Sequence, residues 1–484
     1  MKILVVGAGI AGMGAALALA APDREIIVLE RDPPPPNLGM DEVFDTWERK
    51  GVTQLRHAHG YPARFFNIIR DRHPALLKAL LEAEAREVTF GNNLSPALQK
   101  RYRPQPGDAD LSVLLSRRTT LEFVMRAYVE SRPGISFATD TKVRGLVVEK
   151  GRDGIHTLKA LRIEKPDSTQ EEMRADLIVD ASGRNSNFRD WLTELGIVPE
   201  VEEEPVGVVY YTRHYRLRPG KKLTYSTDTA RVELDFLLGG VLLEDGNNLA
   251  VMFQVPLGET ILRQRILHPE VFDRICAALP AIAEWTGRSD PVNNPLGMGN
   301  LKNMWVHWLK NGKPLVKNFF AIGDAAIRTN PAFGRGCTFA FVQADILAEI
   351  LRETDDPLAR IKSFEKKVEA AIRPFYMQIV RQDRMIIERA GNAHDPGYRP
   401  NFRTRLMKSF AENAVIPAVR GNISMRRAFS RGRHMLEDPN IWLRKKPGLL
   451  LRLLIIWAMP RWTKAYLPPT ALDYATLMAL VNAT

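Results

Sequence analysis

Three glycines near the start of the chain have the spacing of a phosphate-binding turn. Gly7, Gly9 and Gly12 follow an apolar run and open a segment rich in alanine. In such a turn Gly7 permits the tight bend, Gly9 lets the backbone approach a pyrophosphate, and Gly12 lets a helix pack on the preceding strand. The N-terminus of that helix offers free N–H groups and a partial positive charge to phosphates. These residues predict a dinucleotide site.

An acidic residue lies where the ribose of a dinucleotide would need it. Glu30 follows the apolar run Glu25 to Leu29, and its carboxylate can accept both hydroxyls of an adenosine ribose. A 2′-phosphate would be repelled there, so the site disfavours NADP. We expect Arg31, the next residue, to contact the same cofactor.

A second acidic residue, Asp324, follows an apolar run that begins at Phe319. After it come three further candidates and then a helical segment through Ala348; the candidates are Pro331, Gly334 and Gly336. An aspartate at a strand end can accept from a ribityl hydroxyl, and the next helix N-terminus can point at the pyrimidine edge of an isoalloxazine. NAD contains neither group. The pattern therefore favours FAD.

These residues need a Rossmann-type framework to position them. Lys2 to Val6 predicts a buried strand, the glycine turn leads into a helix to about Ala21, and Glu25 to Leu29 predicts the second strand. The N-terminal apolar run also resembles a signal peptide, but cleavage would remove the glycine motif, so we expect the run to be retained. At 484 residues the chain is too long for one core.

At these positions the sequence resembles the class A FAD-dependent monooxygenases, the family of 4-hydroxybenzoate hydroxylase, which is related to flavin halogenases and geranylgeranyl reductases. Asp324 and its neighbours match the family's Gly-Asp motif, except that Ile327, Thr338 and Gln343 replace its histidine, asparagine and later aspartate. Residues 177–189 resemble its central strand and Asp-Gly motif, with Ser182 in place of the aspartate. Two arginines also match family segments that contact FAD, Arg49 in R-x-G-V and Arg118 in R-x-x-L.

The resemblance implies an α/β fold with three parts. A discontinuous, three-layer ββα FAD-binding domain of Rossmann type would cover 1–85, 110–195 and 295–360. A β-rich substrate domain would cover 86–109 and 196–294, and a basic helical region 361–484. In this family strands such as those predicted at 206–216 and 231–255 form a sheet over the reactive face of the flavin. The residues of these strands that become substrate-pocket candidates are Tyr210, Tyr211, Arg213, Phe236, Met252 and Phe253.

The resemblance also implies a reaction. A monooxygenase of this family inserts one atom of dioxygen into an apolar or aromatic small molecule through a flavin C4a-hydroperoxide, and a dry pocket protects that species. The electron donor would be NAD(P)H or a separate flavin reductase. The family's Asp-Gly aspartate handles NAD(P)H, so Ser182 leaves the donor open, and Asp180 is a substitute candidate. The sequence identifies no catalytic residue.

Other functions stay open. A flavin-dependent isoprenoid or lipid reductase would suit a membrane-facing tail. A halogenase is disfavoured because Trp305 and Trp308 are three residues apart and no Ile-Pro follows, unlike the halogenase motif. The chain could also be a docking protein with structural FAD. His57 and His59 form an H-x-H pair that offers a catalytic base or local hydrogen bonds, and no further ligands that would complete a metal site can be identified.

Composition bears on location and partners. Two cysteines cannot form a disulfide framework, which favours the cytoplasm. The net charge is +12, and residues 401–484 hold 14 Lys and Arg against 4 Asp and Glu. No nucleic-acid motif accompanies this charge, so we expect no nucleic-acid partner. Gly448 to Met459 is apolar apart from Arg452 and too short to span a bilayer. It is either a peripheral segment on an anionic membrane or a helix packed on the FAD domain. The residues that favour the membrane are the flanking Arg444, Lys445, Lys446, Arg461 and Lys464, with Trp457 and Trp462 close by.

Overall fold

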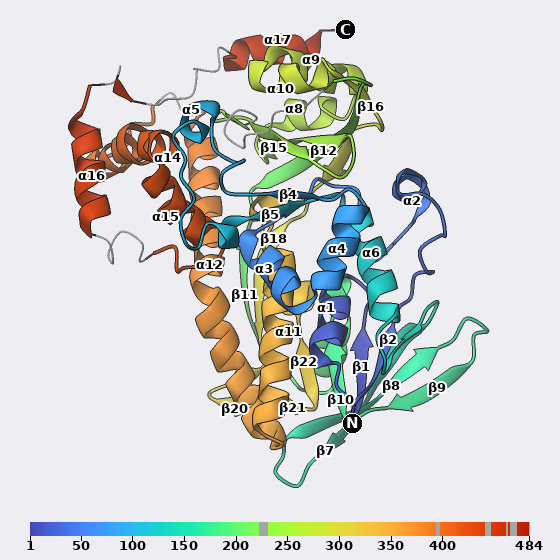
Figure 1. The fold of residues 1–484 in the computed structure, drawn as a ribbon. Coiled ribbons are helices and arrows are strands. Elements are labelled where there is room, and N and C mark those ends of the chain that lie inside the picture. The colour runs from blue at the N-terminus through green and yellow to red at the C-terminus, as the bar shows by residue number, and fades with distance from the viewer. Residues whose placement is uncertain (222–230, 394–396, 441–446, 461–462, 465–471, 484) are drawn as a thin grey trace.

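A five-stranded parallel sheet lies at the centre of the computed structural model, which describes residues 1–221, 231–393, 397–440, 447–460, 463–464 and 472–483 (Figure 1). Its strand order is β22-β10-β1-β2-β6. The bounds are β1 Lys2–Val6, β2 Glu25–Leu29, β6 Ile135–Ala138, β10 Leu177–Asp180 and β22 Phe319–Ala321. Strands such as β1 and β10 read as unbroken apolar runs because both faces of a parallel sheet are covered.

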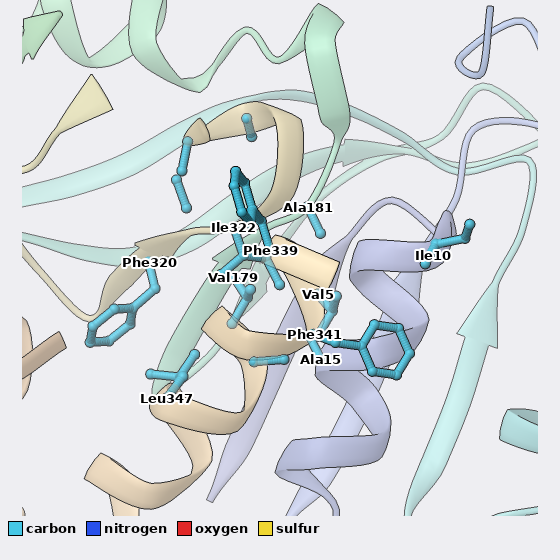
Figure 2. Close-up of a cluster of buried hydrophobic side chains, with 14 of the residues drawn as sticks. Val5, Ile10, Ala15, Val179, Ala181, Phe320, Ile322, Phe339, Phe341 and Leu347 are labelled. Atoms are coloured by element: carbon cyan, nitrogen blue, oxygen red, sulfur yellow. The ribbon is translucent and has the colours of Figure 1, made fainter. Parts of the chain in front are cut away.

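Two helices pack together on this sheet, α1 (Ile10–Leu19) and α11 (Gly336–Glu353). Their close approach depends on Gly14, where an added Cβ would lie 2.8 Å from the ring of Phe341. Figure 2 shows Phe341 beside Ala15 of α1, with Val5 and Val179 of the sheet in the same apolar cluster. This packing brings the start of α1 and the start of α11 to one end of the sheet.

A separate layer of strands contacts β10. In it β8 (His156–Glu164) pairs antiparallel with β7 (Lys142–Lys150) and β9 (Gln170–Arg174), and β21 (Val316–Lys317) pairs with β8 in parallel. Strand β11 (Glu200–Pro205) pairs with β18 (Lys302–His307), which also pairs with β23 (Ile327–Arg328). A segment assigned from the sequence to the substrate part thus pairs with one assigned to the FAD part.

The second large sheet has the order β13-β14-β15-β12-β16, with β17 also paired to β12. Its bounds are β12 Val208–Leu217, β13 Arg231–Glu233, β14 Leu238–Leu243, β15 Asn248–Pro256, β16 Ser289–Pro291 and β17 Leu296–Met298. One face is covered by α8 (Thr260–Arg265), α9 (Pro269–Ala278), α10 (Pro280–Thr286) and α17 (Tyr474–Asn482), at the top of Figure 1. The end of the chain therefore packs on the part of the molecule that carries this sheet.

The chain beyond residue 356 is helical where it is described. Helix α12 (Pro357–Ala393) is long and lies beside α11 (Figure 1), and four shorter α-helices and a π-helical turn (Ala411–Val415) follow among the described residues before α17. The four α-helices are α13 (Phe402–Phe410), α14 (Ile416–Gly421), α15 (Ile423–Arg433) and α16 (Pro447–Ala458). Among the described helices none is long and apolar enough to cross a membrane.

The remaining elements link these layers. The helices are α2 (Met40–Thr46), α3 (Ala63–Arg72), α4 (Pro74–Glu82), α5 (Pro96–Gln99), α6 (Arg118–Glu130) and α7 (Phe188–Glu194). The strands are β3 (Gly60–Tyr61), β4 (Arg86–Val88), β5 (Val113–Leu115), β19 (Leu309–Lys310) and β20 (Lys313–Pro314). The mixed α/β class expected from the sequence is confirmed.

Candidate functional site

A cavity of about 910 Å³ lies where the carboxyl ends of β1, β2, β10 and β22 meet. Ligand pockets span roughly 300–1,000 Å³, and this edge of an open parallel sheet is where such folds bind ligands. Ten of the eleven residues that the sequence assigns to the cofactor line it; they are Gly7, Gly9, Glu30, Arg31, Arg49, Arg118, Asp324, Pro331, Gly334 and Gly336. The fold thus gathers segments separated by 300 residues of sequence into one site.

The three glycines of the turn have distinct roles. Gly7 has φ +100°, and a Cβ there would lie 2.7 Å from the carbonyl oxygen of Ala181. At Gly12, the one predicted cofactor residue outside the cavity lining, a Cβ would lie 1.8 Å from the Gly7 carbonyl oxygen. At Gly9 a Cβ would meet no protein atom within 4 Å and would project into open space at the cavity wall. Gly7 and Gly12 shape the turn, and Gly9 leaves room beside it.

Glu30 is a buried carboxylate held at the cavity wall. Its oxygens accept from the backbone N–H groups of Ala8 at 2.8 Å and Asp32 at 3.0 Å, and it pairs with Arg49. A carboxylate has about four acceptor sites, so about one site, on Oε1, is left for a ribose hydroxyl. Arg49 also donates to the Ala8 carbonyl and to Glu122. Its guanidinium therefore holds the carboxylates of Glu30 and Glu122 in place. The R-x-G-V resemblance predicted a contact with FAD and not this pairing.

The buried ion pairs continue from Arg49 along the wall. Arg118, at the first position of α6, donates to Glu122 at 2.6 Å, so Glu122 lies between two arginines. Burial opposes charge on Arg49, but Glu122 and Glu30 outweigh it and raise its pKa. Glu122, which holds both arginines without lining the cavity, was not predicted from the sequence, although its position four residues after Arg118 on a helix was a usable signal.

Asp324 faces the cavity from the turn after β22. Burial raises the pKa of its carboxyl, against the lowering effect of Arg328, Arg118 and Arg184. Within the described chain no group hydrogen-bonds to this carboxylate. The turn itself is held by Gln343, whose side-chain oxygen accepts from the N–H of Gly323 at 2.9 Å. The Gln343 departure from the family motif thus supports the turn that presents Asp324.

The loop between Asp324 and α11 is tied to three other segments. Asn330 accepts from Ala332 N at 3.0 Å and from the Tyr210 hydroxyl, and it donates to Asp383 of α12 at 2.5 Å. Asn303 of β18 donates to the same carboxylate at 2.7 Å. Burial raises the pKa of Asp383 to about 6. This network fixes the loop that carries Pro331 and Gly334.

Asp180 has a structural role in the neighbouring loop. Its carboxylate accepts from Ser182 N at 3.0 Å, Ser182 Oγ at 2.5 Å and Ser186 Oγ at 2.6 Å. These bonds hold the turn after β10, whose residues Ser182 and Gly183 line the cavity. Asp180 is buried and, unlike Glu30, does not line the cavity, which does not favour a role in binding a nicotinamide there.

The substrate candidates divide between the two faces of the β12–β15 sheet. Tyr211 and Phe253 are buried against α8 and α9, and Arg213 pairs with Asp273 of α9 at 2.7 Å. Phe236 also joins this cluster and packs on the ring of Tyr474. Tyr210 and Met252 instead belong to the apolar cluster that includes Ala332 of the loop between Asp324 and α11. Adjacent residues of a strand point to opposite faces, so the candidate strands could not supply all six side chains to one pocket.

His59 lines the cavity, and His57 lies behind it. Burial lowers the pKa of His57 to about 4 and that of His59 to about 3, so both rings are neutral near pH 7. His59 Nδ1 lies 2.6 Å from the carbonyl oxygen of His57, which assigns its proton to Nδ1 and leaves Nε2 as an acceptor. His57 contacts Thr212 Oγ1 at 3.0 Å. Across the described ranges no three His, Cys, Asp or Glu side chains form a metal-binding group.

The chain, with its cavity at the carboxyl edge of a parallel sheet, has a fold that solved flavoproteins share. The chain aligns with a probable FAD-dependent monooxygenase, PqsL of Pseudomonas aeruginosa, with a TM-score of 0.58 and 16% identity over 82% of this chain and 99% of that one. A flavoprotein/dehydrogenase of Cytophaga hutchinsonii aligns with a TM-score of 0.62 and 16% identity over 94% of this chain and 99% of that one. The flavin-dependent brominase Bmp2 aligns with a TM-score of 0.59 and 12% identity over 93% of this chain and 100% of that one. The chain has the fold of these proteins, which confirms the resemblance drawn from its motifs.

The sequence itself has a more similar relative. Protein Rv3254 of Mycobacterium tuberculosis is 27% identical over 376 residues, which cover 72% of each chain. No protein-family model matches the chain.

Proposed function

We propose that this protein is an FAD-dependent monooxygenase that acts on an apolar or aromatic small molecule. The observation that carries the proposal is the convergence of Glu30 and Asp324 on one cavity, on either side of the glycine turn at Gly7 and Gly9. Glu30 would hold the adenosine ribose, the turn and the start of α1 the pyrophosphate, and Asp324 the ribityl chain. When bound, FAD would supply the redox chemistry and the reaction with dioxygen.

The chain's own features fit this cofactor. The space beside Gly9 would accommodate a phosphate, and the Asp324 carboxylate, which accepts no hydrogen bond from the described residues, would accept from hydroxyl donors. The start of α11, at Gly336 and Cys337, faces the same cavity and would present backbone N–H groups to an electron-rich ring edge.

The substrate would lie in the same cavity, in the part lined by His59, Tyr61 and Pro331. Tyr210 and Met252 pack with Ala332 of the loop that carries Pro331, and this apolar cluster would help to exclude water, as oxygen transfer requires. His59 Nε2 would accept a hydrogen bond from a substrate hydroxyl and orient it, because the neutral ring keeps that lone pair available. NAD(P)H or a separate flavin reductase would supply electrons.

The test is isotopic. The FAD-loaded protein is reduced anaerobically with NADH, NADPH or a flavin reductase, and then mixed with ¹⁸O₂ and a panel of phenols and apolar compounds. The proposal predicts a product that carries one ¹⁸O atom. A saturated product without ¹⁸O would instead identify a reductase, and a product formed only with added halide would identify a halogenase.

A further inference from the structure

Helix α16 is apolar on both of its faces, although only one of them is packed. Leu453 is fully buried in a small cluster with Ala414, Ala418 and Met425 of the preceding helical segments. Leu449, Ile456 and Trp457 lie partly buried against the same cluster. In chain order, Leu449, Leu453, Ile456 and Trp457 are separated by four, three and one residues, so they form a single inner stripe on the helix.

The outer stripe of α16 is exposed and aliphatic. The exposed fractions are 41% for Leu450, 60% for Leu451, 45% for Leu454 and 54% for Ile455. Their spacing of one, three and one residues places them side by side on the helix surface. Single exposed leucines are ordinary, but a contiguous exposed aliphatic stripe marks a contact surface.

The neighbouring helix α13 adds apolar and basic side chains. It touches α16 through the rings of Phe410 and Trp457, whose centroids are 5.4 Å apart. On α13 the exposed fractions are 71% for Phe402, 40% for Leu406 and 59% for Met407. The exposed basic residues of the two helices are Arg403, Arg405, Lys408 and Arg452.

This helical unit is fixed to the body of the protein. Arg427 of α15 forms a two-pronged pair with Asp108, at 2.6 and 2.8 Å. Arg335, which directly follows Gly334 of the loop between Asp324 and α11, donates to the carbonyl oxygen of Arg433 at 3.2 Å. Figure 1 shows α16 at the outer edge of the molecule, beyond α14 and α15. An occupant of the outer stripe would thus hold the whole body in a defined position.

We propose that the exposed surface of α16 and α13 binds the surface of an anionic phospholipid bilayer. The outer stripe of α16 offers aliphatic area without polar groups that a protein partner would need to match, and its surroundings are basic. At about 1.5 Å per residue, the twelve residues of α16 span roughly 18 Å, which is less than the ~30 Å hydrocarbon core, so the helix lies in the interface. The inference is independent of the proposed reaction. Of the basic flank expected from the sequence, Arg444, Lys445, Lys446 and Arg461, with Trp462, lie outside the described residues.

The experiment is flotation of the full chain with vesicles. Phosphatidylcholine vesicles are compared with vesicles that also contain phosphatidylglycerol, at about 0.1 M and about 1 M salt, where the Debye length falls from about 10 to about 3 Å. The variant Leu451→Glu/Ile455→Glu is compared with Leu195→Glu/Ile261→Glu, which adds the same charge at positions exposed by 50% and 52% elsewhere. Flavin content and circular dichroism check that each protein is folded.

We expect the wild type to float with anionic vesicles at low salt and much less at high salt or with phosphatidylcholine alone. The partition coefficient of the α16 variant on anionic vesicles should be lower than that of the wild type by roughly tenfold or more, because the variant removes two aliphatic contacts. The control variant should float like the wild type. The proposal is overturned if the wild type stays at the bottom, if it floats equally well with neutral vesicles, or if both variants behave alike. A dimer that the α16 variant dissociates, without lipid binding, would show a protein interface instead.

Discussion

Replacing Asp324 with alanine should weaken FAD binding without weakening the apoprotein. A hydrogen bond to a charged group contributes about 1.5–3 kcal/mol, so its loss should raise the FAD dissociation constant roughly ten- to hundredfold. The carboxylate is partly buried, and no group in the described chain donates a hydrogen bond to it. Its removal loses the attraction of Arg328, Arg118 and Arg184 but also relieves the burial of a charge, and the raised pKa means that burial outweighs that attraction. The apo melting temperature should stay the same or rise.

Equilibrium titration and thermal shift together test this reasoning. With FAD at 100 times the wild-type dissociation constant, the wild type gains about 2.7 kcal/mol of stability, whereas a hundredfold weaker variant gains only about 0.4 kcal/mol. Asp355→Ala is the matched control, because that side chain is fully exposed. An unchanged dissociation constant in Asp324→Ala would refute the assignment of this carboxylate to the cofactor. A lower apo melting temperature would show that it stabilises the fold.

Three further changes test the surroundings of the cavity. Gly9→Ala should fold with the apo stability of the wild type and lose FAD affinity, as titration with FAD would show. Gly12→Ala should not give folded protein on expression, because the added Cβ at position 12 would lie 1.8 Å from the carbonyl oxygen of Gly7. Arg49→Ala removes the only arginine that pairs with buried Glu30 in the described chain and one of the two that pair with Glu122, and should lower the unfolding free energy by about 3–5 kcal/mol, measured by denaturant; a change below 1 kcal/mol would count against the buried pairs. Asp383 holds a proton more tightly in the folded than in the unfolded protein, so its contribution to stability is greatest below pH ~4 and is lost as pH rises towards 6. The difference in melting temperature between the wild type and Asp383→Asn should follow that window, and a difference constant from pH 4 to 7 would contradict the raised pKa.

The glycine turn and the acidic residues that line the cavity could be predicted to lie together because their requirements are local. A tight turn with φ +100° at Gly7 and a collision at Gly12 can only be met by glycine, so the spacing itself records the geometry. Asp324 and Gly334 were predictable for the same reason, since each lies at a turn directly after or before a regular element. Such positions leave a signal in a single sequence.

The substrate side could not be predicted because it depends on which way strands face. Tyr210 and Tyr211 are adjacent in sequence, yet one joins the network around Asn330 and the other bonds to the helix layer at Arg263. Asp383 lies on a helix far along the chain and enters the site only through tertiary packing. The use of Arg49 to brace Glu30 and Glu122 likewise requires knowledge of the packed α6 helix.

The most direct test of the account is the identity of the bound flavin. The chain is purified, and any chromophore released by heat is analysed by mass spectrometry; the apoprotein is then titrated with FAD and with FMN. The account predicts released FAD and much tighter binding of FAD than of FMN, because Glu30 and the glycine turn can act only on the adenosine and pyrophosphate half. Release of FMN alone, equal affinity for both flavins, or no flavin binding would contradict it.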